Sequence, residues 1–515
     1  MLLAELARTS ADVAATRSRL AKRAALAACI EAAGPDEIEL VVGYLAGSLR
    51  QRRTGVGWAS LGTPPPPADR ATLTVADVDA AFEAIAAFGG SGSAAARQQA
   101  VEAVFARATA AEQPFLRGLV FGDLRQGALD SLVQDGVAAA FGVDLKVVQR
   151  AAMLLGSTGT AARLLAEAGV PALQALTLQV GVPIKPMLAA SAPEPAAALA
   201  KSGLPAIVDA KLDGIRAQVH KDGDRIRVFT RSLDDITDRV PEIVAAVSAL
   251  RATTLVLDAE AVALRTDGKP LPFQEIASRT MSSTDVGTAA ARTPLSLFCF
   301  DLLHVDGTDL LDEPLTLRAR RMTELLPAEL IVRRTVIDSA EQAAATFAQA
   351  VADGFEGVVI KNPDAPYAAG RRDAAWVKVK PRHTLDLAVI GAEWGYGRRT
   401  GWLSNLHLAA RDPDTGGLVM LGKTFKGLTD AMLTWQTEQF LARESRRTKY
   451  AVFADPPLVA EIAFDGVQRS TRYPGGVALR FARVLRYRDD KTPDEVDTID
   501  TVRSLGIQES TGEPA

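Results

Sequence analysis

This chain of 515 residues has little of several things that would define other classes of protein. Two cysteines, Cys29 and Cys299, are too few for a disulfide framework or a Cys-based zinc site, and they point to a reducing compartment. No uninterrupted apolar span reaches the ~20 residues of a membrane helix. Glu5 and Arg8 interrupt the first apolar run, so we expect no signal peptide. Aromatic residues make up 5%, so Ala, Leu and Val must build the cores.

Two common kinds of reactive site are also missing. The four histidines share no ligand spacing, which argues against a His-based zinc or acid–base site; they are His220, His304, His383 and His407. No G-x-x-x-x-G-K-[ST] sequence is present, which removes the P-loop ATPases. With 48% hydrophobic and 23% charged residues, the composition is that of a globular protein and excludes a wholly disordered chain.

The net charge of −4 hides an uneven distribution. Residues 489–515 include eight acidic and two basic side chains, whereas residues 386–488 include fifteen basic and ten acidic ones. A basic module followed by an acidic tail suits a polyanionic partner. On charge alone, a solvated surface with a disordered tail explains the pattern equally well.

The hydrophobic pattern changes twice along the chain. Up to about residue 180, apolar residues recur at helical spacing. Over 181–384, short β-branched runs alternate with helical patterns, which predicts an α+β domain with a large antiparallel sheet. Residues 385–490 contain closely spaced strand patterns with Asp/Gly turns, which predicts a small closed barrel. Residues 491–515 are polar and acidic, and we expect them to be disordered.

The most informative stretch is Asp209-Ala-Lys-Leu-Asp-Gly-Ile-Arg216. It has a lysine at the end of an apolar strand, followed by an Asp-Gly turn and a second strand. Such a hairpin would hold Lys211 near the sheet, and Gly214 would allow a turn that other residues strain to adopt. A surface hairpin with a solvated lysine is the alternative that this hexamer leaves open.

The pattern K-x-D-G-x-R resembles the first motif of the covalent nucleotidyltransferases, which are the ATP-dependent DNA ligases, RNA ligases and mRNA capping enzymes. The resemblance implies that Lys211 attacks the α-phosphate of a nucleotide and carries the nucleoside monophosphate. Attack needs the neutral amine. The family's further motifs follow in order, as Phe229-Thr-Arg231-Ser, Leu257-Asp-Ala-Glu260, Phe298-Cys-Phe300-Asp-Leu-Leu, Glu356-Gly-Val-Val-Ile-Lys361, and Arg372 with Trp376-Val-Lys378-Val-Lys380.

The resemblance implies a role for each of these positions. Asp209 would contact the adenine amino group, Arg231 would lie near the nucleotide and substrate phosphates, and Phe300 would stack on the adenine. Glu260 would face the ribose and the metal, and Glu356 would serve the metal. Carboxylate oxygens are hard ligands, which suit Mg²⁺ (or Mn²⁺) better than Zn²⁺. The cations expected to neutralise the triphosphate are Arg216, Arg231, Lys361, Arg372, Lys378 and Lys380.

Singly, these residues could be core aromatics or surface ion pairs, but their joint order argues for a site. The flanking parts indicate which branch of the family applies. Residues 115–129 resemble the DNA-binding domain of the larger ATP-dependent DNA ligases, with a plain helix-turn-helix connection as the alternative. Arg480–Lys491 resembles the sixth motif, in an OB-fold domain. Two positions depart from the family, since Asp209 stands where many members carry Glu and Ala482 where proline is common.

We therefore predict an ATP-dependent DNA ligase, similar to archaeal and eukaryotic replicative ligases. Its parts would be an all-α DNA-binding domain (1–180), an α+β nucleotidyltransferase (adenylation) domain (181–384), a β-barrel OB-fold domain (385–490) and an acidic tail (491–515). We expect a cytoplasmic monomer, without membrane contact, that joins the nucleoid when it binds DNA. It would seal nicked double-stranded DNA through a lysyl-adenylate and a DNA-adenylate, in replication, repair or recombination. An RNA ligase or capping guanylyltransferase, and a DNA-clamping scaffold with a degenerate catalytic domain, are the alternatives.

Overall fold

The computed structural model describes residues 1–51, 54–57, 64–90, 92–124, 126, 130–271, 275–276, 279–280, 285–368 and 372–505, with the backbone alone at 372 and 373. The chain divides into two compact units, Met1–Val379 and Lys380–Ala515. The first unit therefore contains both the helical part and the α+β part that the sequence pattern separates. Across the described ranges, no helix is both long enough and apolar enough to cross a membrane.

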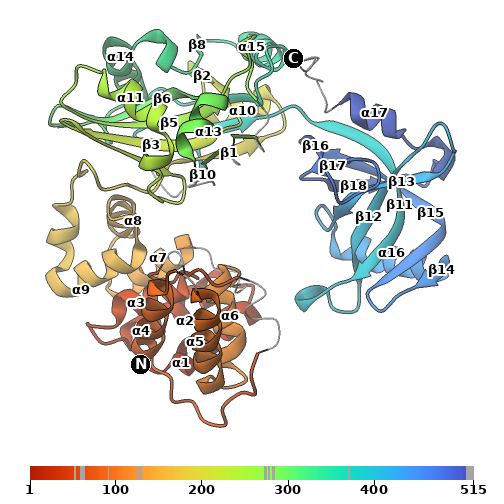
Figure 1. Cartoon of the computed structure of the whole chain (residues 1–515), viewed down its shortest axis with the longest axis horizontal. Helices are drawn as coiled ribbons and strands as arrows, with labels where there is room; N and C mark the ends of the chain where they lie inside the picture. Colours follow the sequence, from red (N-terminus) through yellow and green to blue (C-terminus); the bar gives the residue numbers. More distant parts are fainter. Residues whose placement is uncertain are drawn as a thin grey trace. The chain divides into compact units, whose positions relative to one another are not determined.

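The first part of this unit consists of helices, which confirms the periodicity (Figure 1). Side chains fix several helix starts: Thr74 and Asp77 form a capping box, and Ser157 accepts from a first-turn amide. Leu, Val, Ile and Ala dominate the core, together with Tyr44 and Phe82. The helices are α1 (Leu3–Ala15), α2 (Arg19–Glu31), α3 (Ile38–Leu45), α4 (Val75–Ala87), α5 (Ser93–Arg107), α6 (Glu112–Phe121), α7 (Asp130–Ala140), α8 (Leu145–Leu154) and α9 (Thr158–Gln174).

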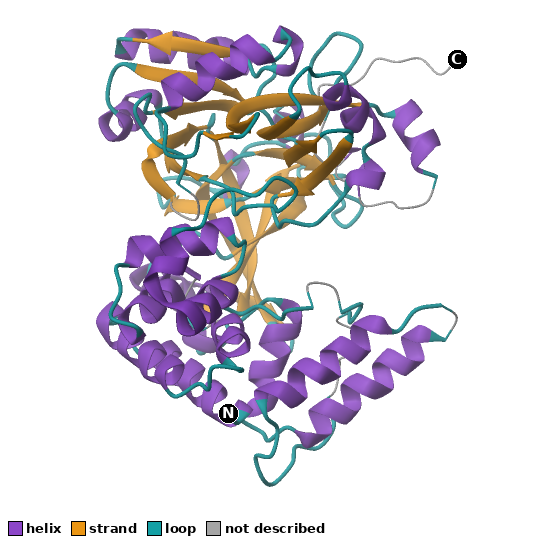
Figure 2. Ribbon diagram, turned by 90° about the vertical axis from the view of Figure 1, so that its left-hand side faces the viewer, coloured by secondary structure: helices purple, strands orange, loops and turns teal. Residues whose placement is uncertain are grey.

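The α+β part of the first unit is built on strands with helices packed against them (Figure 2). The strands are β1 (Leu188–Ala192), β2 (Ala206–Lys211), β3 (Ile215–Asp222), β4 (Arg225–Thr230), β5 (Thr254–Ala263), β6 (Leu295–Val305), β7 (Thr308–Asp309), β8 (Arg334–Ile337), β9 (Gly357–Lys361) and β10 (Arg372–Val379). The α-helices are α10 (Pro195–Ser202), α11 (Pro241–Ser248), α13 (Val286–Arg292), α14 (Leu315–Leu325) and α15 (Ala340–Ala352), and the short 3-10 helices are Thr237–Arg239 and Ala328–Leu330.

These strands form two sheets, not the one large antiparallel sheet that the sequence predicted. One five-stranded sheet has the order β1-β10-β9-β2-β8, in which β1 and β10 run parallel. The other has the order β4-β3-β5-β6-β7 and is antiparallel. The prediction was wrong because β2 pairs with β8 and β9 instead of with β3.

The chain passes from one sheet to the other at the turn after Lys211, so the predicted β-hairpin is also wrong. Gly214 lies in this turn, and its conformation is not left-handed. A Cβ there would lie 2.4 Å from the carbonyl oxygen of Ala261 and 2.7 Å from Cγ2 of Val262. The glycine is therefore required for the close approach of the turn to β5.

Side chains tie the helical part of the first unit to its α+β part. Met153 of α8 packs in a buried cluster that also contains Met187 and Trp376. Lys185 Nζ lies 2.6 Å from a carboxylate oxygen of Asp130, at the start of α7. The buried cluster explains why the two parts form one compact unit.

The second unit is mainly β-structure. Its main sheet has the order β13-β12-β11-β15-β14, with β18 also on β15, and β16 pairs with β17. Strands β14 and β18 pair with opposite ends of the long β15. The hydrogen-bonded pairs among the described strands do not close into the barrel that the sequence predicted. The elements are β11 (His383–Trp394), β12 (Leu403–Arg411), β13 (Leu418–Thr424), α16 (Asp430–Ala442), β14 (Glu444–Arg447), β15 (Ala451–Phe464), β16 (Gly466–Arg469), β17 (Val477–Arg480), β18 (Arg483–Tyr487) and α17 (Ile499–Ser504), with 3-10 helices at Gly397–Arg399 and Pro493–Glu495.

The first part of the acidic tail packs onto this unit. Val496, Ile499 and Val502 are each at most 3% exposed. The backbone N–H of Asp386 donates to the carboxylate of Asp497 at 2.8 Å. Disorder, which we expected for all of 491–515, is therefore wrong for 491–505, because apolar residues at helical spacing bury against the sheet. Residues 506–515 lie outside the described part of the chain.

Candidate active site

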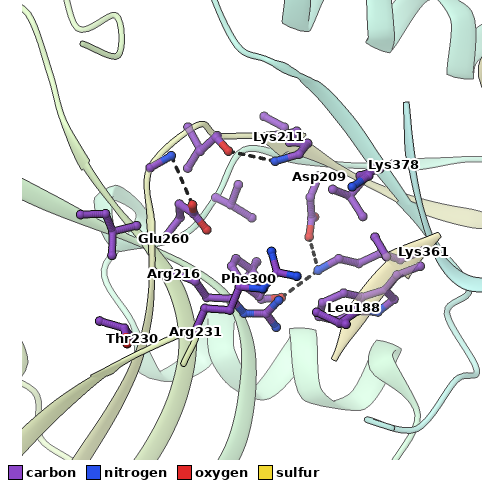
Figure 3. Close-up of a pocket in the computed structure, with 18 of the residues that line it drawn as sticks. Leu188, Asp209, Lys211, Arg216, Thr230, Arg231, Glu260, Phe300, Lys361 and Lys378 are labelled. Carbon is purple, nitrogen blue, oxygen red and sulfur yellow. Dashed lines mark hydrogen bonds and ion pairs between the residues drawn. The ribbon is translucent and has the colours of Figure 1, made fainter. Parts of the chain in front are cut away.

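A pocket of about 400 Å³ opens beside the turn that follows β2 (Figure 3). Eight of the predicted site residues line it, and they are Asp209, Lys211, Arg216, Arg231, Glu260, Phe300, Lys361 and Lys378. Glu356 contacts Lys211 directly. Arg372 begins β10, and its side chain lies outside the described residues. Lys380 belongs to the second unit, where it lies 3.8 Å from Asp465.

Lys211 ends β2 and is partly sheltered. Its Nζ lies 2.7 Å from Oε2 of Glu356 and donates to the carbonyl of Leu212 at 3.2 Å. The backbone N–H of Glu356 donates in turn to the carbonyl of Lys211 at 2.9 Å, which fixes the two residues relative to each other. The arrangement presents an amine with a carboxylate beside it, as a nucleophile and its proton acceptor require.

Glu260 lies on the other side of the lysine, on β5. Its Oε1 accepts the backbone N–H of Gly214 at 3.2 Å. Burial raises the pKa of Glu260 to about 7, against the opposing attraction of Lys211 and Arg216. Near neutral pH this carboxyl is therefore divided between its two forms, and a bound cation would favour the ionised one.

Glu260 and Glu356 together fit a magnesium ion that is shared with a nucleotide. Mg²⁺ is held by one or two protein carboxylates, and phosphate oxygens and waters complete its shell. Within the described ranges, no group of three or more His, Cys, Asp or Glu side chains is arranged to hold a metal ion.

Arg216 is held mostly by protein atoms. Its Nε donates to Asp258 at 2.8 Å, Nη2 contacts the same carboxylate, and Nη1 donates to the carbonyl of Met187 at 2.7 Å. Burial works to lower the pKa of Arg216, but Asp258, Tyr367 and Glu260 together more than offset it, so the pKa is raised. The guanidinium lies 5.2 Å from the ring centroid of Phe300. It supports that aromatic ring and also lines the pocket, and its role as a phosphate-binding cation stays a prediction.

Lys361, another of the predicted phosphate-binding cations, is buried and paired. It is 1% exposed, with Nζ 2.6 Å from Asp209 and 4.1 Å from the ring centroid of Trp376. Burial lowers the pKa of Lys361. Burial works to raise the pKa of Asp209, but Arg334 and Lys361 more than offset it and the pKa is lowered. The lysine therefore supports the apolar end of the pocket, because its position on β9 points it into the protein.

The remaining cations suit phosphates. Arg231 is exposed just past the end of β4, and Lys378 lies on β10. Arg231 lines the nucleotide-sized pocket and also a second hollow of about 1150 Å³ between the helical and α+β parts of the first unit. It is thus available to groups that enter from either hollow. The stretch 115–129, expected to bind DNA, is described except for residues 125 and 127–129, and its Leu119–Gly122 line the second hollow.

Sequence reasoning missed three residues of this site. Tyr367 donates its hydroxyl to Asp258 at 2.7 Å, and Arg334 donates to Asp209. Asp258 could have been found, because it precedes Glu260 by two residues on one strand and so shares its face. Nothing in the local pattern marks Tyr367 or Arg334, since their partners are distant in sequence.

In the second unit, the stretch that resembles the sixth motif is not one continuous strand. The strand ends at Arg480, Phe481 has a positive φ of 55°, and a new strand begins at Arg483. Arg486 pairs with Glu461 at 2.7 Å, and Arg488 pairs with Asp386 at 2.8 Å.

Comparisons with known proteins agree along the whole chain. A family model described as ATP dependent DNA ligase domain matches residues 186–380, one described as ATP dependent DNA ligase C terminal region matches 399–491, and one described as DNA ligase N terminus matches 59–138. A curated protein of Beutenbergia cavernae named "Probable DNA ligase" is 60% identical over 513 residues, covering 98% of this chain and 99% of that protein. A protein of the same name from Nocardioides sp. is 58% identical with the same coverage.

A solved structure named "Pmar-Lig_Pre." shares the fold, with a TM-score of 0.63. Its sequence is 19% identical, and the match covers 94% of this chain and 99% of that one. The likeness therefore extends over all the parts described above, although at this identity it concerns the fold alone.

Proposed function

Since this chain belongs to the family of ATP-dependent DNA ligases, we propose that it seals nicks in duplex DNA through an AMP group carried on Lys211. The observation that supports this best is the placement of Lys211 Nζ, in a pocket of nucleotide size and 2.7 Å from a carboxylate oxygen. Arg231 and Lys378 on the same pocket supply positive charge for phosphates.

The reaction proceeds in three displacements at phosphorus. Lys211 Nζ forms a bond to the α-phosphorus of ATP, pyrophosphate leaves, and Glu356 takes the ammonium proton. A 5′-phosphate oxygen of the nick then attacks the same phosphorus and displaces the lysine. Finally the 3′-hydroxyl attacks the 5′-phosphorus, forms the phosphodiester and releases AMP. The chain contributes mainly by positioning and by stabilising charge.

Glu260 and Glu356 would hold Mg²⁺ (or Mn²⁺) together with the nucleotide phosphates. When bound, the ion would screen the phosphate charge that otherwise repels a nucleophile. Burial raises the pKa of Glu260 to about 7, and a bound cation would favour its ionised form. Asp209 and Phe300 are assigned to the base, Arg231 and Lys378 to phosphates, and Arg372 to the phosphates by resemblance.

The flanking parts would hold the DNA. We assign residues 1–180 as a DNA-binding domain, 181–384 as the adenylation domain and 385–490 as an OB-fold domain. Exposed aromatic side chains with neighbouring cations support a nucleic-acid surface on the last of these. Tyr396 is 79% exposed, and Lys426 Nζ lies 5.0 Å from the ring centroid of the exposed Phe481. Since one chain supplies every proposed group, the enzyme would act as a monomer.

Two other residues of the second unit, an aromatic and a lysine, are less suitable for that surface. Trp394 packs against the core of the second unit, and Lys423 forms an ion pair with Glu393. The proposed surface therefore centres on Tyr396 and Phe481.

The test is covalent labelling of the purified full-length protein. With α-labelled ATP we expect a labelled protein band that pyrophosphate reverses, and none with Lys211→Ala. Lys201→Ala is the matched control, because Lys201 is an exposed lysine whose Nζ donates to the carbonyl of Ser191. A labelled band from Lys211→Ala at wild-type intensity would refute the nucleophile.

The same assay separates the other classes. A capping enzyme would be labelled by GTP, and an RNA ligase would join nicked RNA in preference to nicked DNA. A scaffold with a degenerate catalytic domain would bind nicked DNA and take no label. Labelling by ATP together with sealing of nicked DNA is the outcome we expect.

A further inference from the structure

The apolar end of the nucleotide pocket is supported by two cations, the partly buried Arg334 and the buried Lys361, that contact the same two acceptors. Arg334 Nε and Nη2 donate to the carboxylate oxygens of Asp209 at 2.6 and 2.8 Å, and Nη2 also donates to the carbonyl of Phe300 at 2.7 Å. Lys361 Nζ lies 2.6 Å from Asp209 Oδ2 and 3.3 Å from the same carbonyl. Asp209 and Phe300 line the pocket.

This cluster is more than a link between strands. Asp209 and Arg334 are register partners on β2 and β8, and the backbone N–H of Ala210 donates to the carbonyl of Arg333 at 2.9 Å. The backbone alone therefore joins the two strands. Burying an ion pair costs desolvation energy that its Coulomb attraction only partly offsets. The two-point contact of Arg334 with Asp209, called the fork below, is therefore not needed to hold the two strands together. What it does add is a fixed orientation for one carboxylate.

The carboxylate that is fixed in this way lies where a base would sit. Asp209 and Lys211 are two residues apart on β2 and project from the same face. A nucleotide with its α-phosphate at Lys211, as the proposed function requires, would extend its base toward Asp209. Apolar side chains around that end suit a flat ring, and they are Leu188, Val332, Val359 and Trp376.

The hydrogen bonds that Asp209 already accepts limit which groups of a base it can bind. A carboxylate offers about four lone-pair positions, and Arg334 and Lys361 occupy three of those of Asp209. About one position is left, and it can only accept. A ring that carries an amino group can donate to it, whereas a ring with a keto oxygen at that place brings two oxygens together.

We propose that Arg334 is a positioning residue for base selection: by holding the Asp209 carboxylate in one orientation, it favours a 6-amino purine over a 6-keto purine. Without the fork, Lys361 alone would hold Asp209 at a single oxygen. The carboxylate could then rotate and accept the N1–H of a 6-keto purine, so discrimination would fall. This inference rests on the proposed labelling of Lys211.

The experiment compares single-turnover labelling of the full-length protein by ATP and by ITP. The variants are Arg334→Gln, Arg334→Lys, and Arg333→Gln as the matched control, since Arg333 is the exposed neighbour that pairs with Asp353 at the surface. In both Arg334 variants we expect the preference for ATP to fall about tenfold, as the loss of one oriented hydrogen bond would give. The half-saturating ATP concentration should rise while the maximal labelling rate stays near that of the wild type.

Thermal unfolding of each variant accompanies the kinetics. If Arg334→Gln does not fold, Arg334→Lys carries the comparison, because it keeps the charge and loses the two-point fork. An ATP preference unchanged in a folded Arg334 variant, or lowered as much in Arg333→Gln, overturns the inference. A wild-type protein that takes no label from ATP overturns the proposed function instead, so the two failures are distinguishable.

Discussion

The turn that follows Lys211 has no room for a side chain at Gly214, and filling it should damage catalysis more than folding. In Gly214→Ala the new Cβ would lie 2.4 Å from the carbonyl oxygen of Ala261. Carbon–oxygen contacts are normally about 3.3 Å or longer, so the turn must move by about 1 Å. A misplacement of that size costs about 10²-fold in rate, whereas overpacking of this kind costs about 1–3 kcal/mol of stability.

The assay is the rate of Lys211 labelling by α-labelled ATP, measured with thermal unfolding on the same preparations. Gly287→Ala is the control, because a Cβ at Gly287 in α13 meets nothing within 4 Å. We expect Gly214→Ala to label about 100-fold more slowly and the control to match the wild type. If Gly214→Ala labels within about threefold of the wild type, the close approach does not position the lysine.

Three further outcomes are expected. Glu356→Gln should lose labelling at every Mg²⁺ concentration, because an amide cannot take the lysine proton, and should lose more at low Mg²⁺ than at high, if the carboxylate also helps to hold the ion; a loss that is equal at every concentration would contradict the metal-holding role. Arg231→Ala should reduce, by about one, the slope of the logarithm of the nicked-DNA binding constant against the logarithm of the salt concentration. The pKa of His220 is lowered to about 3 by burial and then by Arg227. His220 thus stays neutral in the folded protein, whereas in the unfolded chain it is protonated below about pH 6.5. The free energy of unfolding therefore decreases by about 1.4 kcal/mol for each unit by which the pH is lowered below that value. His220→Asn, which keeps an acceptor for the Gly181 N–H, should flatten that fall in urea titrations.

Local chemistry was sufficient to name candidate site residues that the structure brings together in one pocket. Lys211, Glu260 and Phe300 could be named because each belongs to a short motif, and the motifs occur in the family's order. The helical character of residues 1–180 could be predicted because apolar side chains at a 3.6-residue period must lie on one face of a helix. Those expectations depend on residues that are close together in the sequence, because motifs and periodicity record only separation along the chain.

Strand pairing decided the rest. Arg334 lies 125 residues from Asp209 in the chain, and only the register of β8 on β2 brings the two together. The same pairing separates β2 from β3, which turned an expected hairpin into a crossing between sheets, and it directs Lys361 into the protein. At the C-terminal end, burial against the second unit outweighed the acidic composition of residues 491–505. The sequence by itself therefore determined which side chains can react, whereas the tertiary structure decided which of them are buried and paired, because a side chain's partners follow from strand register and burial that no local pattern records.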